Sequence, residues 1–214
     1  MQISYMRMIR NIINKSPKEQ IMGEMGWNRF GSQRRMEARD FIWLAALGCG
    51  QRLPFDLEDL CLAIDDIAGQ VWTPSVDVVA GCIEEMVRGG TLAPVGPAQD
   101  RFCTTEAGRQ ILALLLGQPC GQVGCPLGQV GLRMKLAFLD LAPNELRREH
   151  LDQIIAACRD ALEECQRRCD ICAAEGRFGQ QWLRHEADRL RRDLGALLDM
   201  REDEPPVSRS VGMA

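Results

Sequence analysis

The sequence predicts a mainly α-helical protein: a winged helix-turn-helix domain with a two-stranded β-wing, followed by long antiparallel C-terminal helices. Three observations lead to this fold class. Three helical patterns follow one another between residues 39 and 90, two β-prone segments and a capped helix come next, and two long amphipathic patterns fill residues 144–200. The 214 residues, 46% hydrophobic and 26% charged, suffice for one or two globular domains.

The first helix is predicted from the spacing of its apolar residues. The positions recurring at steps of three and four are Phe41, Leu44, Ala45 and Leu47. Gly48 and Gly50 are expected to end this helix, because glycine is a poor helix former.

The second and third helices are predicted from the residues that can cap their ends. Asp56 is a suitable N-cap for the second helix, which Gly69 is expected to close. Ser75 can cap the third helix, and Gly89 and Gly90 should stop it. Its inward face is expected to comprise Val79, Cys82, Ile83 and Met86. In a helix-turn-helix, this third helix is the one that enters the major groove of DNA.

Two short β-prone segments, Thr91–Val95 and Arg101–Cys103, are expected to form the wing. Between Leu92 and Phe102 the chain contains Pro94, Gly96, Pro97 and Asp100, and Arg101 is the only cation of this stretch. The stretch Thr104–Arg109 then opens a fourth helix.

Five segments are expected from composition and periodicity. They are a basic N-terminal extension (1–38), the winged helix-turn-helix domain (39–117), a Gly/Pro-rich linker (118–131), a helical dimerisation domain (132–200) and a disordered tail (201–214). The glycines and prolines of the linker cannot sustain a helix or a strand throughout its length. The first C-terminal helix is therefore expected at residues 132–141.

The two long C-terminal helices have more apolar surface than they can bury on each other. Cys158, Cys165 and Cys172 are spaced by seven residues, and so are Leu183, Leu190 and Leu197. We therefore expect oligomerisation. The expected dimer-interface residues are Leu151, Ile155, Cys158, Leu162, Leu183, Leu190, Leu194 and Leu197.

Four motifs resemble the PadR family of transcriptional regulators. Phe41–Leu47 is similar to the family's first helix, and Val71–Ser75 is similar to its turn before the recognition helix. Thr105–Arg109 resembles the motif after the wing, and Lys135–Pro143 resembles the start of the helical C-terminal domain. The resemblance implies a homodimer that binds palindromic double-stranded DNA as a repressor. It also implies a small-molecule effector or a thiol event that changes the angle between the winged domains.

Candidate DNA-binding residues combine the winged domain with the basic extension. They are Thr73, Ser75, Arg88, Arg101, Arg109, Arg34, Arg35 and Arg39. Residues 1–39 hold eight basic and three acidic side chains, which suits a phosphate backbone but also an ordinary solvated surface. Helix capping is the alternative role for Thr73 and Ser75.

Glu84 and Glu85 occupy positions where the resembled family has basic residues. Anions at these positions repel phosphates, and the wing has only one cation, Arg101, to attract them. The alternative function is therefore a winged-helix dimer that has lost DNA recognition and acts as a protein-interaction module or a thiol or metal sensor. The residues considered for a metal are Cys165, Cys169, Cys172 and His185, although cysteines packed as small apolar residues between helices explain them more simply.

Neither an enzyme nor a cofactor is expected. Only His150 and His185 are available as bases near neutral pH, and no Gly-rich phosphate loop or nucleophile elbow is found. No apolar run is long enough for a membrane span, and polar residues interrupt the apolar residues of the first thirteen positions. A cytoplasmic location with reduced thiols is expected.

Overall fold

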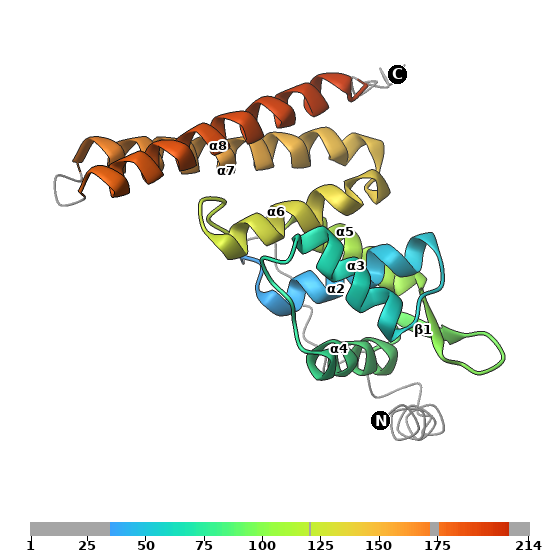
Figure 1. Cartoon of the computed structure of the whole chain (residues 1–214). Coiled ribbons are helices and arrows are strands. Elements are labelled where there is room, and N and C mark those ends of the chain that lie inside the picture. Colours follow the sequence, from blue (N-terminus) through green and yellow to red (C-terminus); the bar gives the residue numbers. More distant parts are fainter. Residues whose placement is uncertain (1–34, 120, 172–175, 206–214) are drawn as a thin grey trace, which may run out of the picture.

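The computed structural model describes residues 35–119, 121–171 and 176–205 of the chain (Figure 1). Its elements, in order, are α2 (Ala38–Arg52), α3 (Leu57–Ala68), α4 (Val76–Arg88), β1 (Leu92–Val95), β2 (Arg101–Thr104), α5 (Glu106–Gly117), α6 (Pro126–Phe138), the short 3-10 helix η2 (Leu139–Leu141), α7 (Asn144–Ile171) and α8 (Arg177–Asp203). The predicted fold class, a winged helix-turn-helix followed by long antiparallel helices, is confirmed.

Figure 1 shows the winged domain on one side of α6 and the antiparallel pair α7 and α8 on the other. The larger core surrounds α2, whose residues 41–47 are all buried, and it continues into α6 through Val130, Met134 and Phe138. A second core lies mainly between α7 and α8. Among the described helices, none has both the length and the apolar composition needed to span a membrane.

Helix α2 does not end at Gly48 or Gly50, as the sequence had suggested, but continues to Arg52. A Cβ on Gly48 would overlap the ring of Phe138, and one on Gly50 would lie 2.7 Å from the hydroxyl of Thr104. These glycines allow close packing of α2 against its neighbours, and burial of the helix outweighs their poor helix propensity.

The predicted boundaries of α3 and α4 are confirmed. The Asp56 side chain accepts a hydrogen bond from the backbone N–H of Asp59 at 2.9 Å, and Gly69 ends α3 with a positive φ of 64°. Ser75 occupies the N-cap position of α4, and Gly89 follows its last residue. The inward residues of α4 are all buried, as predicted from their spacing.

The wing is an antiparallel hairpin in which Leu92 pairs with Thr104 and Val95 pairs with Arg101. Phe102 on β2 is buried and forms an isolated bridge with Phe55, so the base of the hairpin is fixed to the chain before α3. The predicted strands are confirmed, and β2 extends one residue further than expected.

Helix α6 begins at Pro126, within the stretch predicted to be a linker, rather than at Leu132. Proline is favourable at the first position of a helix, and the Cys125 sulfur accepts a hydrogen bond from the N–H of Gly128. Gly128 is also needed for packing, because a Cβ there would overlap the Gln122 carbonyl. The domain boundary at 118–131 stays a prediction.

The long C-terminal helices α7 and α8 bury most of their heptad residues within one chain. Six of the eight predicted interface positions are buried here, namely Leu151, Ile155, Cys158, Leu183, Leu190 and Leu197, and Leu162 and Leu194 are partly buried beside them. Helix α8 continues to Asp203, past the expected start of the disordered tail at residue 201. Arg201 contributes to this extension by donating to Asp152 on α7 at 2.9 Å.

Candidate nucleic-acid interface

The outer side of α4 is the surface that a helix-turn-helix presents to DNA. The residues Asp77, Gly81, Glu84 and Arg88 recur at steps of three and four, opposite the buried side of the helix. Arg88 is exposed and forms no ion pair with another described residue. The outer side of α4 therefore has one cation near its C-terminal end and two carboxylates before it.

Glu85 does not share this outer surface with Glu84, which corrects the expectation of two outward-facing glutamates. Its carboxylate pairs with the guanidinium of Arg39 at the start of α2, and its side chain is only 22% exposed. On the helical wheel, Glu85 lies on the flank of α4 rather than opposite the core, so the spacing alone could have separated the two residues. Arg39, predicted to bind DNA, is thus engaged within the fold.

Thr73 and Ser75 flank Pro74 in the turn between α3 and α4. The Thr73 hydroxyl donates to the carboxylate of Asp65 at 2.7 Å, while Ser75 occupies the N-cap of α4 without a capping hydrogen bond from its side chain. Both residues are exposed. Ser75 therefore retains a hydroxyl for another acceptor, whereas Thr73 would have to exchange an intramolecular bond.

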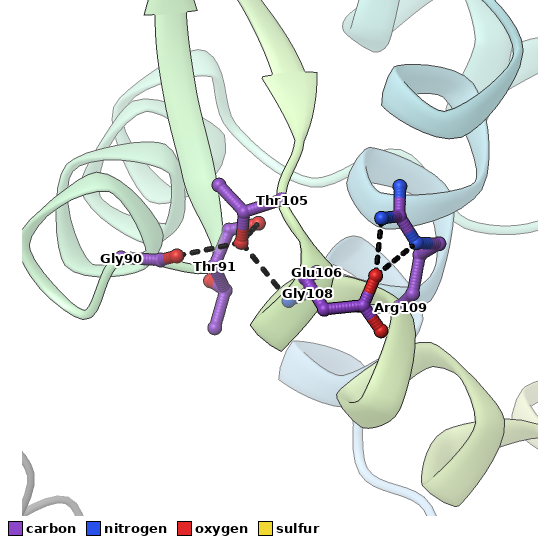
Figure 2. A network of polar contacts seen from close by, with 6 residues as sticks. All are labelled: Gly90, Thr91, Thr105, Glu106, Gly108 and Arg109. Atoms are coloured by element: carbon purple, nitrogen blue, oxygen red, sulfur yellow. Dashed lines mark hydrogen bonds and ion pairs between the residues drawn. The ribbon is translucent and has the colours of Figure 1, made fainter.

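Arg101 and Arg109 are exposed, but both form ion pairs. Arg101 on β2 donates to Asp59 on α3 at 2.9 Å. Arg109 donates from Nε to Glu106, one turn earlier in α5, at 3.0 Å (Figure 2). Exposed ion pairs are weak, about 1 kcal/mol or less, so both cations could exchange partners for a phosphate.

The Thr105–Arg109 motif connects the wing to α5, as Figure 2 shows. The Thr105 hydroxyl donates to the Gly90 carbonyl at 2.7 Å and accepts from the N–H of Gly108 at 3.1 Å. It thereby links the end of α4 to the first turn of α5. The motif positions the wing relative to the recognition helix, which is a structural role for Thr105 and Gly108.

Of the basic extension, Arg35 is exposed and Arg34 lies outside the described residues. Arg35 borders a cleft of about 870 Å³ between residues 119–125, α7 and α8. Charged side chains of both signs line this cleft, among them Glu164, Arg168 and Arg189. The cleft lies beside the helices that follow the winged domain, not beside α4.

The helix-turn-helix as a whole is acidic. From Leu57 to Arg88 the chain contains seven acidic residues and one basic residue. The acidic residues are Glu58, Asp59, Asp65, Asp66, Asp77, Glu84 and Glu85. Three of them have partners described above, Arg101 for Asp59, Thr73 for Asp65 and Arg39 for Glu85.

Of the cysteines considered for a metal site, Cys165 and Cys169 lie on α7. Cys165 is buried, and burial together with nearby Cys169 raises the pKa of its thiol. His185 contacts the ring of Trp182, and Cys172 lies outside the described residues. No group of three metal-binding side chains occurs in the part of the chain that the structure describes.

A buried polar cluster that the sequence analysis did not identify joins α5, α6 and α7. The Lys135 ammonium donates to the Leu116 carbonyl at 2.7 Å and also to the Gln118 carbonyl. Gln118 and His150 are buried, and burial and the positive charge of Lys135 lower the pKa of the His150 imidazole. Lys135 lies three residues before the buried Phe138, a spacing that could have indicated its inward position.

Comparison with protein families relates this geometry to known proteins. The family described as "Putative AphA-like transcriptional regulator" matches residues 32–200. The chain belongs to this family. The prediction of a PadR-like transcriptional regulator from the sequence motifs is confirmed at the level of the family. The family is one of transcriptional regulators.

Among solved structures, the AphA-like chain is similar to the crystal structure of Bacillus subtilis PadR. The two are 13% identical, with a TM-score of 0.36, over 78% of this chain and 97% of that chain. A search of curated proteins finds no match.

Proposed function

We propose that this AphA-like regulator binds double-stranded DNA as a homodimer and acts as a repressor. The observation that carries the proposal is the family match over residues 32–200, which includes the whole helix-turn-helix, the wing, α7 and all but the last three residues of α8. A two-fold dimer would present two α4 helices to the half-sites of a palindrome.

Arg88 is the side chain of the helix-turn-helix best suited to contact DNA. It is exposed at the C-terminal end of α4 and has no ion-pair partner among the described residues. Ser75 lies at the other end of α4 and can donate its hydroxyl to a phosphate. Arg101 on the wing can add a further phosphate contact by leaving Asp59.

Fluorescence anisotropy tests this function with the purified full chain and labelled DNA from upstream of its coding region, against a scrambled duplex. We expect tighter binding to the upstream DNA and a steep loss of affinity with added salt. Arg88→Gln should weaken binding about fivefold or more, since it removes one cationic contact. Arg184→Gln, which changes an exposed arginine on α8, is the matched control and should bind normally.

No binding to either duplex at low salt would contradict the proposal, because non-specific attraction to phosphates is then strongest. The second candidate function, a winged-helix module that binds another protein, would then be favoured. The acidic composition of Leu57–Arg88 supports that candidate, since seven carboxylates oppose a phosphate backbone.

A small-molecule effector is part of the proposed regulation. The cleft beside residues 119–125 is the place that we propose for it, because it lies between the segment leading into α6 and the two long helices. A ligand bound there could change the position of α7 and α8 relative to the winged domain. Its mixed charges favour a polar ligand over a purely apolar one.

A further inference from the structure

We propose that the basic N-terminal segment, residues 1–34, docks on the acidic outer face of α3 and α4 in the same chain. We use the name acidic face for solvent-facing residues of the two helices, which are Glu58, Leu62 and Asp66 on α3 and Asp77, Val78 and Glu84 on α4, with Arg88 as their single cation. Residues 1–34 lie outside the described structure, and the proposal uses only their sequence and the point where they join the fold.

The acidic face has charges that the fold leaves without a cation. Glu58, Asp66 and Asp77 are exposed and Glu84 is half-buried, and none of the four forms an ion pair with another described residue. By contrast, Asp59 and Glu85 on the same two helices pair with arginines. Negative potential therefore remains at the outer side of the helix-turn-helix.

The acidic face also carries exposed apolar side chains. Leu62 and Val78 are 59% and 52% exposed, and Val71 and Val76 in and beside the connecting turn are exposed to a similar degree. Exposed apolar side chains among mostly acidic neighbours are typical of a surface that receives a protein segment. Bare phosphates would gain nothing from these side chains.

Residues 1–34 complement both properties. They contain six basic residues, Arg7, Arg10, Lys15, Lys18, Arg29 and Arg34, against the two acidic residues Glu19 and Glu24. Ile9, Ile12 and Ile13 lie among the first four cations and can cover the exposed leucine and valines. Cations with interspersed apolar residues are what the acidic face requires.

The segment also joins the fold at the correct place. Arg39, in the first turn of α2, already pairs with Glu85 on α4, so the chain enters the fold beside the recognition helix. A segment of 34 residues spans up to about 110 Å when extended, far more than the length of α4. Because the segment is tethered, its effective concentration at the acidic face is on the order of millimolar, which favours it over a free partner.

Photo-crosslinking in the full chain tests this docking without DNA, so its outcome does not depend on the proposed DNA binding. Val78 is replaced by p-benzoylphenylalanine, and Met200, a 46% exposed residue on α8, is replaced in a control variant. We expect position 78, but not position 200, to cross-link to peptides from residues 1–34. A mixture of isotopically light and heavy protein should give only same-isotope links.

Charge reversal makes the test specific. Changing Arg7, Arg10, Lys15 and Lys18 to Glu should reduce the cross-link several-fold, and adding Glu58→Lys, Asp66→Lys and Glu84→Lys should restore it. Absence of links to residues 1–34 in the folded protein, light–heavy links, or indifference to the reversal would each overturn the proposal. Circular dichroism confirms folding, and Leu62 serves as the second photo-crosslinking position if the Val78 variant does not fold.

Discussion

Gly108 in the first turn of α5 packs directly against the carbonyl oxygen of Thr91 at the start of the wing. A Cβ at this position would overlap that oxygen and would lie 2.8 Å from the Thr104 methyl group. The contact holds α5 against both strands, beside the Thr105 bonds in Figure 2. The glycine of this motif is therefore required by packing, since its φ is not positive.

We predict that Gly108→Ala lowers the free energy of unfolding by about 2–3 kcal/mol, because backbone or core must shift to admit the methyl group. Gly81→Ala on α4 is the matched control, since nothing lies within 4 Å of its Cβ. Alanine there should instead stabilise the helix by about 0.5–1 kcal/mol. Urea denaturation measures both, and equal effects at the two sites would contradict the packing explanation.

A pH dependence of stability is predicted from His150. Burial and the charge of Lys135 lower the pKa of the folded imidazole, so the unfolded chain binds the proton more readily. The contribution to stability is complete above the unfolded pKa of about 6.5 and is lost as the pH falls toward the lower folded pKa. Urea denaturation between pH 7.5 and 5.5 should show this decline.

His150→Gln should flatten this pH dependence, whereas His185→Gln, at an exposed position on α8, should leave it unchanged. Lys135→Met should weaken it, because the loss of the cation lets the folded pKa rise. If the free energy of unfolding of the His150 variant still fell with pH as in the parent protein, another group would cause the pH dependence.

The exposed side of α8 is predicted to contact the second subunit. Phe178 and Trp182 are 82% and 63% exposed and lie one turn apart, whereas the heptad leucines are already buried within the chain. Changing both to Glu should convert the dimer into a monomer in sedimentation equilibrium. Leu53→Glu, at a 74% exposed position after α2, should leave the dimer intact, and a monomeric parent protein would refute the interface outright.

Thiol reactivity should differ between the long C-terminal helices and the wing. Cys165 is buried and burial raises its pKa, so little of the reactive thiolate forms at neutral pH. Cys103 on β2 is only partly buried. Alkylation of the native protein with iodoacetamide, followed by peptide mass spectrometry, should modify Cys103 about tenfold faster or more. Similar rates would mean that α7 and α8 separate readily.

Local signals in the sequence determined most helix and strand boundaries. Asp56 begins α3 because its side chain caps the helix, and Gly69 ends α3 by adopting a positive φ. Ser75 occupies the predicted N-cap position of α4, although its side chain makes no capping hydrogen bond. The buried side of α4 followed from residues three and four positions apart, which share a face in any α-helix. Each of these rules involves neighbours in the chain, so the sequence alone sufficed.

Tertiary structure alone decided which distant groups meet. Gly48 and Gly50 remain inside α2 because Phe138 and Thr104 pack against them, and no local pattern contains that information. The same is true of the ion pair between Arg39 and Glu85, which takes a cation from the predicted DNA-binding set. Apolar spacing predicts that a face is buried, but its partner depends on the free energy of the whole assembled core.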